Sequence, residues 1–223
     1  MTNTLATPAV TATLGRMFAA AARDDTSALL PGGAYATASA LEKADAARDV
    51  YMPISPEAGQ LLYALVRASA PETVVEFGTS FGISTIHLAA AVTDNGAGHV
   101  VTTELNSAKA KAARSNLEQA GVDAVVTILA GDALETLAEV PGPIGLVLLD
   151  GWKDLCLPVL RLLEPRLAPG ALVAGDDSSF PSMAGYLDYV RDPAHGYVSV
   201  SFPVEDGMEI SCWTGNPAPT ARS

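Results

Sequence analysis

The stretch TVVEFGTSFGISTIHLAAAV, residues 73–92, decides the fold. Its first five residues, 73–77, form a β-branched and aliphatic run that is apolar on both faces, as expected of a buried parallel strand. Gly78 and Gly82 follow in a short turn, and residues 83–92 then have helical periodicity. A strand that passes through a glycine turn directly into a helix is typical of a parallel α/β sheet.

Four further strands are expected downstream, each followed by a stretch with helical periodicity. The expected strands cover residues 99–105, 124–130, 144–149 and 171–174, and the expected helices cover residues 107–120, 133–139, 155–167 and 182–190. Two more β-rich runs, YVSVSFPV and MEISCWT, are joined by Glu205, Asp206 and Gly207, a strong tight-turn signal. The pattern predicts an α/β fold with a Rossmann-like, doubly wound sheet of seven strands, mostly parallel, with an antiparallel last strand.

The first 50 residues differ in composition from the rest. They contain Ala-rich helical stretches, interrupted at residues 31–33, and too few large apolar residues to form a core alone. We therefore expect residues 1–50 to be an N-terminal helical extension that lies on the sheet domain as a lid or dimer contact. Residues 51–216 would form the sheet domain, and residues 217–223 a flexible tail.

Composition limits the possible classes of function. The chain has 223 residues, of which 49% are hydrophobic, so one ordinary globular domain can bury a sizeable core. Its 13 basic against 25 acidic residues give a formal charge of -12, which disfavours nucleic acids and anionic membranes as partners. Only two cysteines occur, and we recognise neither a secretory signal nor the ~18 apolar residues that a membrane span needs. We expect a cytoplasmic protein with reduced thiols.

Acidic residues stand at the ends of the first three expected strands. Glu76 and Gly78 precede the first helix in the pattern E-x-G-x-x-x-G, Glu104 ends the second strand, and Asp132 follows the third. Glycines at such a turn let the backbone approach a ligand, and an acid about 20 to 30 residues later can accept hydrogen bonds from ribose hydroxyls. Because Ser80 takes the place of the middle glycine of a dinucleotide fingerprint, a pyrophosphate cradle is less well supported. An ordinary strand-to-helix turn, with a carboxylate that only interacts with a helix dipole, remains the simpler alternative.

Together these strand ends resemble the class I S-adenosylmethionine-dependent methyltransferases. The methyl donor of that family is a sulfonium that carries a cationic amino acid and no phosphate, which suits an acidic loop. The resemblance implies S-adenosylmethionine as cofactor, bound by Met52, Glu76, Gly78, Ser84, Glu104, Asp132 and Asp150.

A second group of acidic residues follows the fourth and fifth expected strands. Asp150 ends the fourth strand in LVLLDGWKD, and Asp176 and Asp177 end the fifth in ALVAGDD, so three carboxylates converge if these strands pair. Three oxygen ligands with room for water suit an octahedral Mg²⁺ ion. The alternative is that these residues only cap helices or form Asx turns.

The segment DGWKD, residues 150–154, is similar to the Asp-x-Trp-Lys-Asp segment of the catechol O-methyltransferases. In that family the Asp binds Mg²⁺ and the Lys removes the hydroxyl proton. The resemblance therefore implies Lys153 as catalytic base and the three acids as ligands of Mg²⁺ or another divalent cation. The segment MPISPEAGQ also resembles the catechol and caffeoyl-CoA O-methyltransferases, and Met52 would then touch the cofactor.

Two departures from the catechol O-methyltransferases concern the acceptor. An acidic residue on the sixth strand holds the second substrate hydroxyl in that family, and a rough register places Val200 there, with Glu205 in the turn as an alternative. Gly151 stands where the animal enzyme has His, which should widen that side of the site. For Lys153 to act as a base, burial and the metal charge must lower its pKa from the ordinary ~10.4.

Other residues with reactive side chains have simpler expected roles. Trp152 either walls the substrate pocket or packs where the sheet meets a helix. Ser178 and Ser179 lack a partner His and the context of a nucleophile elbow, which argues against a hydrolase. We expect the remaining candidates to be structural, namely Cys156, His87, His99 and His195.

We therefore expect an enzyme that transfers the methyl group of S-adenosylmethionine to a hydroxyl of a small aromatic, catechol-type acceptor. The alternatives are a metal-independent methyltransferase of another heteroatom and a non-catalytic cofactor-binding regulator. An NAD-linked dehydrogenase is disfavoured by the glycine spacing. The strong negative charge favours a neutral or cationic phenol over a coenzyme A thioester. A homodimer is the expected assembly.

Overall fold

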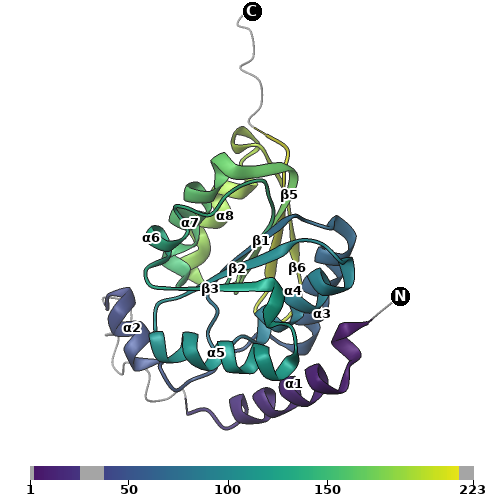
Figure 1. Cartoon of the computed structure of the whole chain (residues 1–223). Helices are drawn as coiled ribbons and strands as arrows, with labels where there is room; N and C mark the ends of the chain where they lie inside the picture. The colour runs from purple at the N-terminus through teal and green to yellow at the C-terminus, as the bar shows by residue number, and fades with distance from the viewer. Residues whose placement is uncertain (1–2, 26–37, 216–223) are drawn as a thin grey trace, which may run out of the picture.

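A computed structural model describes residues 3–25 and 38–215 as three layers, with helices on both faces of a seven-stranded sheet (Figure 1). The sheet order is β3-β2-β1-β4-β5-β7-β6. Strands β1 to β5 are parallel, and β7 is antiparallel to both of its neighbours. The strands are β1 (Thr73–Phe77), β2 (His99–Glu104), β3 (Val126–Ala130), β4 (Ile144–Leu149), β5 (Leu167–Asp176), β6 (Tyr197–Phe202) and β7 (Met208–Trp213). The expected fold class is confirmed.

The strand order places a crevice between β1 and β4. The chain builds β1, β2 and β3 outward in one direction and then returns to add β4 and β5 on the other side of β1. Phe77 and Leu149, the last residues of β1 and β4, are paired in register. In open parallel sheets, ligands bind outside the carboxyl ends of the strands at such a reversal of strand order.

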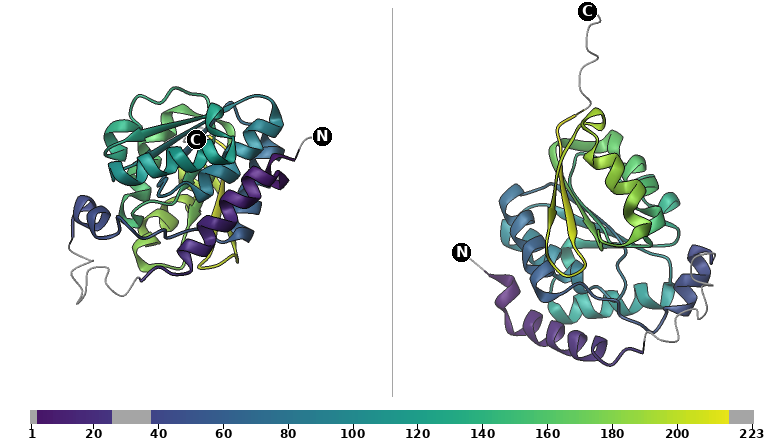
Figure 2. Two further views of the ribbon diagram at one scale, coloured as in Figure 1. Left: turned by 60° about the horizontal axis from the view of Figure 1, so that its bottom comes forward. Right: turned by 180° about the vertical axis from the view of Figure 1, so that it is seen from behind.

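Helices divide between the two faces of the sheet (Figures 1 and 2). One face carries α3 (Pro56–Ser69), α4 (Ile83–Asn95) and α5 (Ser107–Ala120), and the other carries α6 (Ala133–Thr136), α7 (Cys156–Leu163) and α8 (Ala184–Arg191). Consecutive strand residues point to opposite faces, so Val74 joins the first core and Val75 the second. Within residues 3–25 and 38–215, no helix combines the length and the apolar character needed to cross a bilayer.

The N-terminal region packs on the first of these faces. Helix α1 (Pro8–Ala21) lies along α5 and buries Val10, Leu14 and Met17 in the core. A second helix, α2 (Ala40–Ala46), begins with a capping box formed by Ser39 and Glu42. The expected break at residues 31–33 and the expected tail at residues 217–223 lie outside the described residues.

Some expected element boundaries were wrong. The helix expected to run to residue 167 ends at Leu163, and Leu167 already begins β5, four residues before the expected strand. Pro169 and Gly170, which indicate a loop in the sequence, lie inside β5, where its register against β4 shifts between Ile144 and Leu146. A strand irregularity of this kind accommodates proline and glycine without ending the strand. Smaller corrections are β3, which begins at Val126, and α6, which ends at Thr136.

Candidate active site

The turn after β1 brings two strand ends into contact. Gly78 has a φ of +106°, and a Cβ at this position would lie 2.5 Å from the carbonyl oxygen of Asp150. The Asp150 N–H in turn donates a hydrogen bond of 2.8 Å to the carbonyl of Phe77. Glycine alone combines this conformation with so close an approach, so Gly78 lets the end of β4 pack against the end of β1.

Glu104, the last residue of β2, presents its carboxylate to the glycine turn. Its Oε2 accepts a hydrogen bond from the Ser80 N–H and its Oε1 from the Asn106 N–H, each at 2.8 Å. Burial raises the pKa of Glu104, while the Asn106 bond and the charge of Lys109 oppose that rise. The side chain lines the central cavity, and each oxygen keeps a second acceptor position that ligand hydroxyls can use.

Lys109 is a cavity residue that the sequence reasoning missed. Its side chain is almost completely buried, and its Nζ donates to Ser80 Oγ at 3.3 Å and lies 5.2 Å from the centroid of the Phe81 ring. Burial lowers the pKa of Lys109, and the nearby Glu104 carboxylate opposes this change. Its place in the first turn of the helix that follows Glu104 could have indicated a role at the strand end.

Glu76 lies beneath the glycine turn and is completely buried. Its two carboxylate oxygens accept hydrogen bonds from three hydroxyl groups, at 2.5 Å, 2.5 Å and 2.6 Å from Ser84, Thr85 and Thr102. Burial raises its pKa to about 7, although these hydroxyls act in the opposite direction. Ser84 lines the cavity, whereas Glu76 connects β1, β2 and the first turn of α4 from below.

Asp132 and Met52 line the same cavity as the glycine turn. The exposed Asp132 is the N-cap of α6, and its Oδ1 accepts from the Leu134 N–H at 2.7 Å. Met52 is also exposed and has a positive φ of 44°. Both side chains are thus free to touch a bound molecule, and their expected contacts with the cofactor stay predictions.

The three acids that follow β4 and β5 come together. Each of Asp150, Asp176 and Asp177 offers an oxygen that lies within 4.8 Å of the others. Neighbouring residues in an extended strand point to opposite faces, but Asp177 has a φ of 54°, which ends the extended conformation and lets both side chains reach the same edge. Burial and the Asp150 charge raise the pKa of Asp176 to about 9.

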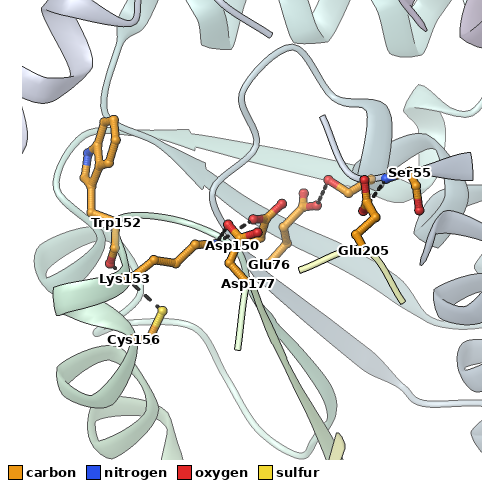
Figure 3. A network of polar contacts seen from close by, with 9 residues as sticks. Ser55, Glu76, Asp150, Trp152, Lys153, Cys156, Asp177 and Glu205 are labelled. Carbon is orange, nitrogen blue, oxygen red and sulfur yellow. Dashed lines mark hydrogen bonds and ion pairs between the residues drawn. The ribbon is translucent and has the colours of Figure 1, made fainter. Parts of the chain in front are cut away.

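Lys153 supplies the cation of this acid cluster. Its Nζ lies 3.0 Å from Asp150 Oδ1 and 2.9 Å from Asp177 Oδ2, and Figure 3 shows it reaching toward both while Trp152 points away. Burial alone would lower the pKa of Lys153, but attraction by Asp150 and Asp177 raises it well above its usual range. The expected lowering of this pKa depends on burial together with a metal charge, so it stays a prediction for the metal-loaded site.

The two groups of residues open into one cavity of about 830 Å³. Glu104 and Asp132 belong to the part beside β2 and β3, and the acid cluster with Lys153 belongs to the part beside β4 and β5. Trp152 and Phe180 line the cavity near the acid cluster. A volume of this size is in the range of small-molecule and cofactor sites, which span roughly 300–1,000 Å³.

The structure corrects two expectations about the acceptor side. Val200 is 60% exposed on the edge strand β6 and does not reach the cavity, whereas Glu205 in the β6–β7 turn lines it. The Glu205 Oε2 accepts from the Ser55 N–H at 2.6 Å, so this carboxylate also joins the turn to the start of α3 (Figure 3). Gly151 does not widen the site, because the Phe77 ring occupies the space where a Cβ would lie.

The remaining candidates take part in packing. His87 Nδ1 pairs with the Ile83 carbonyl, and its ring lies so close to Gly59 that a Cβ there would be 2.5 Å from Nε2. Burial lowers the pKa of His87 and raises that of the Cys156 thiol to about 12. His99 and His195 bond to Thr127 and to the Tyr189 carbonyl.

Known proteins provide an independent comparison. A family model described as a methyltransferase domain matches residues 75–178. Catechol O-methyltransferase B of Danio rerio is 31% identical over 182 residues, which cover 75% of this chain and 68% of that protein. The catechol O-methyltransferase of Mycobacterium tuberculosis is 39% identical over 149 residues, which cover 66% of this chain and 67% of that protein. The solved O-methyltransferase TomG of Streptomyces achromogenes, in complex with S-adenosylmethionine, superposes with a TM-score of 0.65 at 27% identity and covers 80% of this chain and 91% of that one.

These similarities coincide with the site. The matched residues 75–178 begin in β1 and end just after Asp177, so they include the glycine turn, Glu104 and the Lys153 segment. The fold, the cavity at the strand ends and the sequence similarity therefore agree. The chain belongs to the class I S-adenosylmethionine-dependent O-methyltransferases of the catechol and caffeoyl-CoA O-methyltransferase type.

Proposed function

We propose that this enzyme methylates one hydroxyl of a catechol-type acceptor, with Mg²⁺ or another divalent cation held by Asp150, Asp176 and Asp177. Lys153 is the general base. The observation that carries the proposal is the position of Lys153 and three converging carboxylates in the same cavity as Glu104. A methyl donor at Glu104 and an acceptor at Lys153 would meet inside this cavity, beside the glycine turn.

The acid cluster suits a hard divalent cation. Three carboxylates accompany one ammonium group, so the cluster has excess negative charge when all three acids are ionised. Carboxylate oxygens are the ligands that Mg²⁺ prefers, and three of them leave places for other oxygens in an octahedral shell. When bound, the cation would neutralise the cluster, remove the attraction that keeps Lys153 protonated and lower the pKa of a coordinated hydroxyl.

Lys153 is suited to move the acceptor proton. Its Nζ stands at the edge of the acid cluster and in the cavity wall, where an acceptor hydroxyl would lie. A neutral amine there takes the hydroxyl proton, and the ammonium that results is stabilised by Asp150 and Asp177. The acceptor oxygen then forms a bond to the methyl carbon while the bond from that carbon to sulfur breaks. Holding the two atoms in line supplies much of the acceleration.

The acceptor class follows from the ligands and the walls. Two neighbouring positions in the shell fit the two oxygens of a vicinal aromatic diol. Val200 offers no acidic anchor at the cavity, so the cation would hold the second hydroxyl. We therefore expect loose regiochemistry, with either hydroxyl able to face the methyl group. The charge of -12 favours neutral or cationic phenols.

Mass spectrometry tests this proposal directly. The enzyme is incubated with S-adenosylmethionine and either catechol or phenol, with Mg²⁺ and after exhaustive chelation. We expect a product heavier by one methylene unit with catechol and Mg²⁺, and strongly reduced turnover in the other three reactions. Equal rates on catechol and phenol would rule out two-point chelation of the acceptor. Full activity after chelation would instead favour a metal-independent O-methyltransferase.

A further inference from the structure

Helix α2 contacts the loop that carries Lys153. The Lys43 side chain on α2 is 8% exposed, and its Nζ lies 3.3 Å from Asp154 Oδ1. The same Nζ lies 5.9 Å from the centroid of the Trp152 ring. A single cation from a distant part of the chain thus interacts with the residues directly before and directly after Lys153.

Backbone hydrogen bonds hold the loop from residue 150 to residue 154 at its two ends. The Asp150 N–H donates to the Phe77 carbonyl and the Leu155 N–H donates to the Trp152 carbonyl, each at 2.8 Å. The loop contains no helix or strand before the short 3-10 turn Lys153–Leu155, which has no side-chain cap. The Lys153 side chain is held on one side by Asp150 and Asp177. Lys43 holds the neighbouring side chains from the other direction, because Trp152 points away from the acid cluster (Figure 3).

Lys43 also belongs to the cavity wall. Ala40, Lys43 and Ala44 on α2 line the cavity together with Trp152, Asp154 and Leu155. The family model matches only residues 75–178, so α2 lies outside the matched region. This wall therefore comes from a part of the chain outside the region that the family model matches.

We infer that Lys43 is a positioning residue that fixes Trp152 and Asp154 on either side of Lys153 and thereby sets acceptor binding. The inference rests on the proposed function for its kinetic consequence. The contact between Lys43 and the loop does not depend on which acceptor is used. Asp154 is 59% exposed, so water weakens its pair with Lys43, and the Trp152 contact and the burial of Lys43 are equally needed for the effect.

Kinetics of three single variants and of the double variant Lys43→Met/Asp154→Asn test the inference. In Lys43→Met, which keeps the length of the side chain without its charge, we expect the KM for catechol to rise roughly three- to tenfold. We expect a smaller change in kcat and an unchanged Kd for S-adenosylhomocysteine. Lys43→Arg should keep the KM within about twofold of the wild-type value, because a guanidinium can contact both Asp154 and the Trp152 ring. Asp154→Asn should raise KM less than Lys43→Met, and the double variant should be no worse than Lys43→Met alone.

Arg48→Met is the matched control. Arg48 follows α2, and among the residues that the structure describes its one ion pair is with Asp49 at 3.3 Å, where both side chains are exposed. Removing this cation should leave KM, kcat and cofactor affinity unchanged. Equal effects of Lys43→Met and Arg48→Met would assign the change to the general charge of this segment and overturn the inference.

Fluorescence provides a readout that needs no acceptor. Trp152 and Trp213 are the two tryptophans of the chain, so Trp213→Phe leaves Trp152 as the single reporter. In that background, Lys43→Met should increase acrylamide quenching of Trp152 by about twofold, and Lys43→Arg should not. A folded Lys43→Met variant with the quenching and KM of its parent would overturn the inference. If the parent methylates no catechol, the proposed function fails, and the quenching measurement alone decides whether Lys43 holds the loop.

Discussion

The cofactor half and the metal half of the cavity stabilise their acidic residues in different ways. In the cofactor half, at the ends of β1 to β3, each acid accepts hydrogen bonds from groups of the protein. Three hydroxyls bond to Glu76, and backbone N–H groups bond to Glu104 and Asp132. In the metal half, at the ends of β4 and β5, Asp150, Asp176 and Asp177 face one another, and Lys153 pairs with two of them.

The difference shows what each half requires. In the cofactor half, neutral donors are distributed around separate carboxylates, and the charge of Lys109 adds to their effect on Glu104. Carboxylates that share one small volume repel each other, and each raises the pKa of its neighbours. One ammonium group offsets only part of that repulsion. An added positive charge would therefore stabilise the acid cluster, whereas each acid of the cofactor half already accepts hydrogen bonds within the protein.

Replacing one lysine in each half by methionine should separate the effect on catalysis from the effect on cofactor binding. Lys153→Met removes the proposed base and should lower kcat by about 10²- to 10⁴-fold, with the affinity for S-adenosylmethionine nearly unchanged. Lys109→Met, in the cofactor half, should weaken cofactor binding and leave kcat at saturating cofactor within about tenfold of the wild type. Stopped assays at several cofactor concentrations, with calorimetric titration of the cofactor, measure both effects. A Lys153→Met enzyme with wild-type kcat would remove Lys153 from the mechanism.

Asp176→Asn should act on the metal half in two opposite directions. Loss of one ligand should weaken Mg²⁺ activation by at least about 100-fold, judged from the effects of smaller changes around metal sites. In the presence of a chelator the same variant should be more stable than the wild type, by on the order of 1–3 kcal/mol, because the buried member of three neighbouring acids is gone. Turnover over a range of Mg²⁺ concentrations measures the first effect, and urea unfolding with a chelator present measures the second. Lower stability under chelation would show that Asp176 serves mainly as a structural cap.

Glu104→Gln should weaken cofactor binding without affecting the metal half. The amide cannot accept from the Ser80 and Asn106 N–H groups and from ligand hydroxyls as the carboxylate does. We expect a loss of about 1–3 kcal/mol in the binding of S-adenosylmethionine. Calorimetry gives this value, and the Mg²⁺ concentration for half-maximal activity at saturating cofactor serves as the control. Unchanged cofactor affinity in the folded variant would contradict the assignment of Glu104.

Glu76→Gln should have the smallest effect on binding and a distinct effect on stability. The raised pKa of about 7, against an ordinary value of 4.5, means that the folded chain retains a proton that the unfolded chain releases. Stability of the wild type should therefore fall as pH rises through this range, by about 3 kcal/mol at most, and Glu76→Gln should reduce that slope. Denaturant unfolding between pH 5 and 7.5 is the measurement, with each pH about half a unit apart.

The same Glu76 variant also tests the cofactor prediction. Because Glu76 is completely buried and its oxygens are bonded within the protein, we expect Glu76→Gln to weaken cofactor binding less than Glu104→Gln. Equal losses in the two variants would show that Glu76 reaches the donor. Parallel stability curves for wild type and Glu76→Gln would in turn place the pKa of Glu76 near its ordinary value.

Local patterns in the sequence were enough to predict the architecture and the strand ends at which acidic residues gather. A strand of a parallel sheet is covered on both faces, so it is a continuous apolar run in the sequence. The alternation of such runs with stretches of helical periodicity therefore predicts a parallel sheet before any contact is known. The glycine turn with Glu76 and the segment from Asp150 to Asp154 are short and contiguous. Their residue types at fixed spacing were therefore visible without knowledge of the packing. The error at β5 arose because Pro169 and Gly170 end strands locally, whereas a register shift against β4 tolerates them.

Only the tertiary structure decided how these residues face one another. The positive φ of Asp177 brings its side chain to the same edge as that of Asp176. Glu76 lies below the cavity, where it accepts hydrogen bonds from the hydroxyls of Ser84, Thr85 and Thr102. Lys43 reaches Asp154 across 111 positions of the chain. Burial, register and hydrogen-bond partners depend on elements that are distant in sequence, and the pKa of each acid or lysine depends on those partners. The residue types of the site were thus readable from the sequence, but their charge states and their directions come from packing.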